Sequence, residues 1–127
     1  MSSLPEKSQG SFEVWRRRQS RRRARDEALR HSVLEAVCAA LDRLALEYPF
    51  EEAYLFGSVV NPGRFRARSD VDMGVEGLDG SALYRFVADL SGAIGRDVDV
   101  VLLEESGLAP FIRAKGISWK KIRSGRS

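Results

Sequence analysis

The chain has 127 residues, 43% of them hydrophobic, and a formal net charge of +3. This length fits one small domain with a modest core. No apolar stretch approaches the roughly 20 residues of a membrane span, and the polar N-terminus lacks the apolar core of a secretory signal, so we expect a cytoplasmic protein. The single cysteine, Cys38, excludes an internal disulfide and a cysteine-based metal site. Its small apolar neighbours favour a place in the core.

Positive charge is concentrated near the N-terminus. Residues 16–30 contain eight arginines against Asp26 and Glu27, a local charge of +6, so the rest of the chain sums to −3. Only this segment is strongly basic, which argues against a protein whose whole surface binds nucleic acid.

The sequence predicts a long helix in the first half of the chain. Residues 1–10 are polar and contain Pro and Gly, so we expect a mobile tail there. From residue 11 to about residue 47 both helix breakers are absent and good helix formers dominate. The apolar residues step by three and four, as on one helix face that packs on a sheet: Val33, Leu34, Val37, Leu41, Leu44 and Tyr48. His31, the only histidine, is expected to face solvent, which argues against a histidine-based mechanism.

The Arg-rich segment, Arg16–Arg25, has seven arginines in ten residues and little to bury. It either extends the helix into solvent or stays disordered until it binds a partner. A solvated helix end is one interpretation, and contact with an acidic protein or with RNA phosphates is the other. Trp15, directly before it, favours contact, because Trp and Arg are enriched at the centres of interfaces.

A strand, a turn and a second strand follow the helix. Residues 53–56 form a short apolar strand, and Asn61-Pro62-Gly63 is a strong turn signal. The chain returns at residues 70–76 with alternating acidic and apolar side chains. Since residues two apart on a strand share a face, Asp70 and Asp72 should project together.

This hairpin combines a cation site with an anion site. Two adjacent carboxylates repel each other unless a cation or a proton intervenes, and Mg²⁺ prefers oxygen ligands that bridge to substrate phosphates. Gly57 lets a ligand approach the backbone closely, and a helical turn from Ser58 would aim N–H groups at an anion. In the loop, Arg66 and Arg68 are either solvated or neutralise triphosphate charge.

A second helix is predicted over residues 83–94, where apolar residues recur at core spacing. Either Asp79 or Ser81 can cap it. Asp89 falls on its outer face, where we expect it to be solvated.

The remaining chain predicts a strand, a short helix and a further strand. Residues 96–103 have the pattern of a buried strand with acids at its start. Residues 108–115 fit a short helix, because Pro110 falls in its first turn. A short apolar strand that contains Trp119 and a basic tail follow.

Gly57-Ser58, eleven residues, then Asp70-x-Asp72 resembles the signature of the DNA polymerase β-like nucleotidyltransferases, and above all of the minimal nucleotidyltransferases. The loop is slightly longer than is usual there. The family carries a third acid on the next strand, in a context that Val98-Asp99-Val100-Val101 matches. Asp99 is therefore the expected third carboxylate, and Asp97 is the alternative.

The resemblance implies an α/β (α+β) nucleotidyltransferase fold: a small mixed β-sheet with helices packed on one side and a long N-terminal helix. The domain would span residues 31–122. Residues 1–30 would be a basic N-terminal extension, partly disordered or helical, and residues 123–127 a tail.

The resemblance also implies a mechanism. Asp70, Asp72 and Asp99 would be the catalytic residues and would hold two Mg²⁺ ions, with Asp99 also serving as base. Gly57 and Ser58 would bind the nucleotide phosphates. A nucleoside monophosphate, AMP if ATP is the donor, would pass to a hydroxyl acceptor.

Three functions fit these features. The leading one is an antitoxin that transfers AMP to a tyrosine of a partner HEPN toxin. The second is a small-molecule nucleotidyltransferase, for example of aminoglycosides, with its site completed by a partner subunit or in a homo-oligomer. The third is a non-catalytic module of the same fold that binds protein or RNA.

Overall fold

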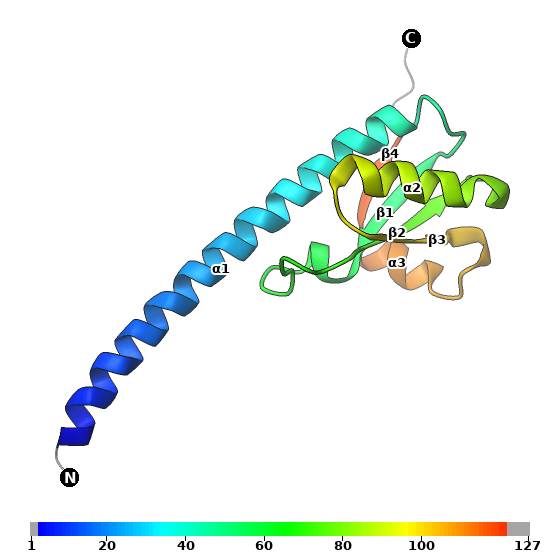
Figure 1. The fold of residues 1–127 in the computed structure, drawn as a ribbon. Helices are drawn as coiled ribbons and strands as arrows, with labels where there is room; N and C mark the ends of the chain where they lie inside the picture. The colour runs from blue at the N-terminus through cyan, green and yellow to red at the C-terminus, as the bar shows by residue number, and fades with distance from the viewer. Residues whose placement is uncertain (1–2, 122–127) are drawn as a thin grey trace.

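The computed structural model describes residues 3–121. At its centre is a four-stranded sheet in the order β3-β2-β1-β4, with α1 and α2 packed on one face and α3 on the other (Figure 1). The strands are β1 (Glu52–Phe56), β2 (Val71–Glu76), β3 (Val98–Leu102) and β4 (Ile117–Lys120). The helices are α1 (Ser3–Leu44), α2 (Leu83–Ile94) and α3 (Ala109–Lys115). The expected mixed sheet and long N-terminal helix are confirmed. The helices do not all pack on one side as expected, because α3 covers the opposite face. The predicted tail at 123–127 lies outside the described residues.

Two kinds of connection make the sheet mixed. β1 and β2 form an antiparallel hairpin, and β4 pairs antiparallel with the other side of β1. α2 carries the chain across the sheet so that β3 lies parallel to β2, as a parallel neighbour requires. The C-terminal end of β1 therefore lies beside the N-terminal ends of β2 and β3.

The main core lies between the sheet and the two helices α1 and α2. Val71, Met73 and Val75 on β2 are fully buried there, as the alternation of a strand predicts. Val37 and Leu41 of α1 pack against them with no exposed surface. The predicted apolar face of the long helix is thus confirmed.

α1 differs from the prediction at both ends. It begins at Ser3, so residues 3–10, which we expected to be a mobile tail, are helical, and it ends at Leu44 rather than near residue 47. Cys38, expected in the core, is exposed. It follows the buried Val37 by one residue, which turns it away from the buried face.

The N-terminal half of α1 extends far from the sheet (Figure 1). We call residues 10–25 the arm; all of its residues are exposed except Gln19, which is half-buried. At the base of the arm, the Asp26 carboxylate lies 3.8 Å from the Arg66 guanidinium in the first ion pair to the body. Within residues 3–121 no helix is both long and apolar enough to cross a membrane.

Two expectations about the second half of the chain need correction. The strand over residues 96–103 is not buried: β3 lies at the edge of the sheet, pairs only with β2, and is at best half-buried. Asp89 is exposed but is not simply solvated, because it accepts a 2.6 Å hydrogen bond from the Tyr48 hydroxyl. His31 is exposed as predicted, and its ring lies 2.9 Å from Glu27.

Candidate active site

The turn after β1 brings the backbone against an acidic side chain. Gly57 has φ = 78°, in the left-handed region that favours glycine. A Cβ at Gly57 would collide with the Asp72 carboxylate, because Phe56 and Asp72 are directly opposite in the hairpin. The 3₁₀ turn expected at Ser58 is present, and the Asn61 side chain donates a 2.6 Å hydrogen bond to the Gly57 carbonyl. Both backbone conformation and space therefore require glycine here.

Two acidic residues face each other beside this turn. Asp72 on β2 is directly opposite Asp99 on β3, so it lies between Asp99 on one side and the Gly57 turn on the other. A third acid, Asp70, stands one residue before β2 begins. Asp72 is half-buried, whereas Asp70 and Asp99 are exposed. The sheet thus presents one partly covered carboxylate with an accessible carboxylate opposite it on the next strand.

The electrostatics agree with this placement. Burial raises the pKa of the Asp72 carboxyl, and the charges of Asp99 and then Asp70 raise it further. Asp97, the alternative third acid, instead accepts a 3.0 Å hydrogen bond at its backbone carbonyl from the Val71 N–H. The register and the charge coupling therefore both favour Asp99 as the neighbour of Asp72.

The two loop arginines point to different places. Arg66 donates a 2.8 Å hydrogen bond to the Gly63 carbonyl and turns toward Asp26 of α1. Arg68, with Asp70 and Asp97, lines a depression of about 350 Å³ at the start of β2. Of the two, Arg68 is the one that shares a surface with a candidate acid.

Sequence reasoning missed Arg96, which holds this loop in place. Its guanidinium donates hydrogen bonds of 3.0 and 2.6 Å to the carbonyls of Ala67 and Ser69, and it lies 4.8 Å from the centroid of the buried Phe65 ring. In the sequence Arg96 stands close to Asp97 and Asp99, and nothing in that pattern indicated that its side chain binds the loop.

A second depression, of about 300 Å³, lies beside the Gly57 turn. Its walls come from the turn and from α3, and are formed by Phe56, Gly57, Val60, Asn61, Phe111 and Lys115. Phe111 is 56% exposed, which is unusual for a large apolar side chain. Sequence reasoning missed the α3 residues, because nothing in their pattern says which part of the sheet α3 covers.

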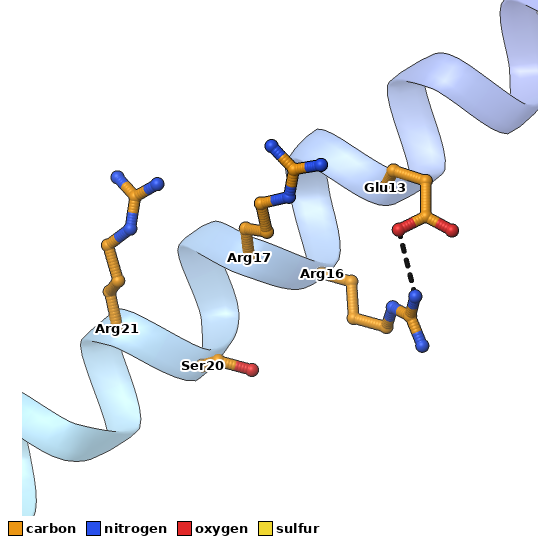
Figure 2. A pocket seen from close by; sticks show the side chains of 5 residues that line it. All are labelled: Glu13, Arg16, Arg17, Ser20 and Arg21. Carbon is orange, nitrogen blue, oxygen red and sulfur yellow. Dashed lines mark hydrogen bonds and ion pairs between the residues drawn. The ribbon is translucent and has the colours of Figure 1, made fainter.

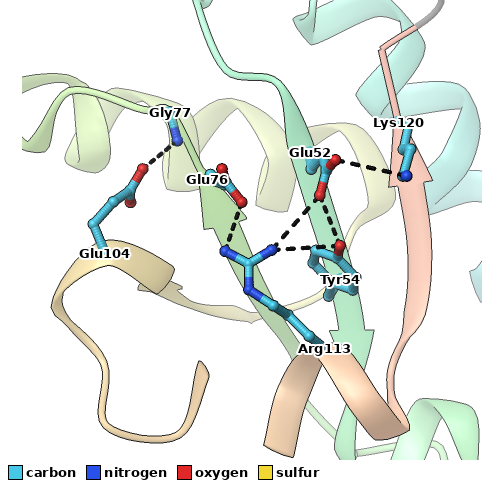
Figure 3. Close-up of polar contacts among 7 residues, drawn as sticks. All are labelled: Glu52, Tyr54, Glu76, Gly77, Glu104, Arg113 and Lys120. Carbon is cyan, nitrogen blue, oxygen red and sulfur yellow. Dashed lines mark hydrogen bonds and ion pairs between the residues drawn. The ribbon is translucent and has the colours of Figure 1, made fainter. Parts of the chain in front are cut away.

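Arg113 ties α3 to the sheet (Figure 3). Its guanidinium donates a 2.6 Å hydrogen bond to Glu76 on β2, lies 3.7 Å from Glu52 on β1, and stands over the Tyr54 ring at 5.4 Å. The Tyr54 hydroxyl in turn donates a 2.7 Å hydrogen bond to Glu52. Two strands and the helix that lines the depression are therefore joined by one polar network.

Solved structures share this fold. A chain in a crystal structure of a toxin–antitoxin with AMP-PNP is 25% identical, over 66% of this chain and 73% of that chain, with a TM-score of 0.56. A structure described as a minimal nucleotidyltransferase is also 25% identical, over 71% and 88% of the two chains, with a TM-score of 0.52. The chain is a nucleotidyltransferase, and it is similar to the minimal type. A chain of the MntA–HepT toxin–antitoxin, 22% identical over 68% and 73% with a TM-score of 0.51, shares the fold.

No family model matches the sequence, and no curated protein matches it. The assignment to the nucleotidyltransferases therefore rests on the structural neighbours together with the Gly-Ser and Asp-x-Asp pattern.

The acids of this nucleotidyltransferase suit a divalent cation by their chemistry. In residues 3–121 no three acidic, His or Cys side chains are gathered closely enough to hold an ion without rearrangement. Carboxylate oxygens are nevertheless the ligands that Mg²⁺ prefers. Burial first, and then the charges of Asp99 and Asp70, raise the pKa of Asp72, and a cation would relieve the part due to these charges. Asp70, Asp72 and Asp99 are therefore a fitting donor set.

A further residue that sequence reasoning missed supports the turn Gly57–Val60 from the core side. Arg30 is 7% exposed and is the one buried charged residue of the described side chains. It donates a 3.1 Å hydrogen bond to the Val59 carbonyl in the turn and bonds of 3.0 and 2.7 Å to Glu27. Since it closes an Arg-rich stretch, the sequence offered no signal that separates it from its exposed neighbours.

Proposed function

We propose that this nucleotidyltransferase transfers AMP from ATP to a hydroxyl group, namely a tyrosine of a HEPN-type toxin, and so acts as an antitoxin. The observation that carries the proposal is the placement of Asp72 between Asp99 and the Gly57 turn. It is supported by the similarity to a toxin–antitoxin structure with AMP-PNP.

Each candidate residue at this end of the strands has a role in the proposal. Gly57 and Ser58 bind the β- and γ-phosphates of ATP, because the glycine turn lets these phosphates approach the backbone. Asp70 and Asp72 face the α-phosphate side, and Asp99 orients the acceptor hydroxyl. Two Mg²⁺ ions held by these carboxylates would supply neutralisation of the triphosphate charge and activation of the acceptor.

The transfer itself is a displacement at the α-phosphorus. The acceptor oxygen forms a bond to that phosphorus while the bond to the bridging oxygen of the β-phosphate breaks, and pyrophosphate leaves. The hydroxyl proton passes to Asp99. Positioning and charge neutralisation supply most of the rate in such reactions, so a small site suffices.

The open position of the acids suits a large acceptor. Asp70 and Asp99 are exposed, and β3, which carries Asp99, is an edge strand. A tyrosine on the surface of a partner protein can reach such an edge more easily than a closed pocket. The same proposal includes ATP as donor and the cytoplasm as location. It also includes homo-oligomer formation and contact of residues 16–25 with a protein partner or with RNA.

The test incubates the purified protein with Mg²⁺ and α-labelled ATP, with and without lysate of its own host, and follows label on protein bands. We expect a labelled host protein with the natural chain and none with Asp70→Asn/Asp72→Asn. Glu35→Gln, which changes an exposed carboxylate on α1, serves as the matched control and should label as the natural chain does. Equal labelling with the double variant would overturn the proposal. Label on small molecules alone would show that the acceptor is a small molecule and not a protein.

A further inference from the structure

The arm carries an unusual density of unneutralised positive charge. Its seven arginines are all exposed: Arg16, Arg17, Arg18, Arg21, Arg22, Arg23 and Arg25. Among the described side chains of the arm, one ion pair is formed, between Arg16 and Glu13 at 2.8 Å. Figure 2 shows this pair on one side of the helix, with Arg17 and Arg21 extended into solvent.

The arginines are spread unevenly around the helix. At about 100° per residue, five of them fall within an arc of about 140°, namely Arg17, Arg18, Arg21, Arg22 and Arg25. Arg16 and Arg23 lie on the other side, where Arg16 is paired with Glu13. The arm therefore presents one broad basic face, which suits the phosphates of a nucleic acid.

The free arm also contains repulsive contacts. Arg17 and Arg21 are four residues apart, as are Arg21 and Arg25, and like charges at this spacing destabilise a helix. The arm packs on no other element that would offset this, because its residues are exposed. A ligand rich in phosphate would remove the repulsion and stabilise the helix.

We propose that the arm is an RNA-binding helix. Arg-rich segments fold on binding RNA, and the unpaired bases of RNA loops and bulges stack on aromatic side chains and on Arg guanidinium planes. A regular DNA duplex and an acidic protein offer no unpaired bases. The exposed rings of Phe12 and Trp15 beside the basic face therefore favour RNA.

Features at both ends of the arm extend this surface. At the far end, the rings of Phe12 and Trp15 stack with centroids 5.9 Å apart and are 53% and 54% exposed, which offers flat faces to unpaired bases. At the base, Arg22 and Arg23 line a depression of about 250 Å³ together with Arg66 of the body. The RNA path thus continues from the arm onto the loop before Asp70.

The first experiment measures fluorescence anisotropy of a labelled RNA stem-loop with an internal bulge as the full chain is added, over a series of salt concentrations. A DNA hairpin of the same sequence and labelled polyglutamate are measured in parallel. We expect the RNA to bind most tightly, with an affinity that falls steeply with salt because phosphate contacts release counterions. Equal or tighter binding of the DNA or of polyglutamate would overturn the proposal.

The second experiment compares two double variants that remove equal charge. Arg21→Gln/Arg22→Gln should weaken RNA binding and lower the slope of log affinity against log salt by about two, one for each lost phosphate contact. Arg43→Gln/Arg85→Gln, at exposed positions outside the arm, should leave the slope unchanged. If the two double variants behave alike, the arm is not the binding surface.

Two further variants separate RNA binding from catalysis and from folding. Trp15→Ala should raise Kd about fivefold to a hundredfold, the usual loss for one stacked base, whereas Asp70→Asn/Asp72→Asn should bind RNA as the natural chain does. Circular dichroism and thermal melting confirm that the body stays folded. Loss of RNA binding in the acid variant would overturn the arm as the site and place the RNA at the catalytic edge.

Discussion

The two faces of the sheet have different tasks. On the face covered by α1 and α2, alternate residues of β2, including Met73, are fully buried in the main core. On the opposite face the same strand carries Asp72, and a small cluster of Tyr54, Leu103 and Ile112 packs under α3. Because neighbouring residues of one strand point to opposite faces, a few residues serve stability and chemistry separately. Substitutions should therefore affect either stability or activity, according to the face they touch.

The largest effect is expected from the acids. Asp70→Asn/Asp72→Asn removes two carboxylates without changing side-chain size, so transfer of AMP should fall by at least about 10²–10³-fold, while the melting temperature should not fall. Glu35→Gln is the control, because it changes an exposed carboxylate on α1. The measurement is label transfer beside a thermal melt. A variant that loses activity only because it unfolds would contradict the separation of the two faces.

Arg30 should give the opposite result. Arg30→Gln removes a buried guanidinium that bonds to the Val59 carbonyl and to Glu27, and the free energy of unfolding should fall by about 2–4 kcal/mol. Arg43→Gln, on the exposed side of α1, should change it by less than about 0.5 kcal/mol. Both values come from denaturant titration. Equal values for the two variants would show that the buried contacts do not support the turn.

Gly57 lies where the two faces meet, and a matched glycine separates its two constraints. Gly57 and Gly63 both have positive φ, 78° and 86°, but only at Gly57 would a Cβ meet another side chain. Gly63→Ala should cost about 1 kcal/mol from backbone strain. Gly57→Ala should cost more and should also lose nucleotide binding, measured with a fluorescent ATP analogue. Equal losses would mean that the contact with Asp72 is unimportant.

The smallest effect concerns stability against pH. The pKa of Asp72 is raised in the folded state, so the folded protein holds this proton more tightly than the unfolded chain, and ionisation destabilises the fold as the pH rises. Without Mg²⁺, Asp72→Asn should therefore melt slightly higher than the natural chain at neutral pH. The gain should vanish at acidic pH, where Asp72 is protonated. A variant that melts lower at neutral pH would show that Asp72 contributes to stability.

Local features of the fold could be predicted from the sequence. The spacing of apolar residues along α1, along α2 and along each strand of the β1–β2 hairpin depends on that element alone. The apolar face through Val37 and Leu41 was therefore predictable. The choice of Asp99 as third carboxylate depended on the resemblance and on Asp97 lying nearer the end of the strand, and the register opposite Asp72 supports it. It stays a prediction until the acids are tested.

Relations between elements could not be predicted. The apolar run at 98–102 fits a central strand as well as an edge strand, because hydrophobicity does not show how many neighbours a strand has. Arg30 and Arg25 are the same residue type five positions apart, yet one is buried against the turn and the other is exposed. The position of Phe111 beside Gly57 depends on how α3 docks, which no pattern within α3 specifies.

The position of β1 in the sheet has a consequence during synthesis. β1 lies between β2, which follows it directly, and β4, which the ribosome makes much later. Until Ile117–Lys120 has emerged, the backbone of β1 from Glu52 to Leu55 offers unpaired N–H and C=O groups beside apolar side chains, the kind of edge that recruits strands from other chains. The nascent protein therefore passes through an aggregation-prone stage, and docking of β4 ends it.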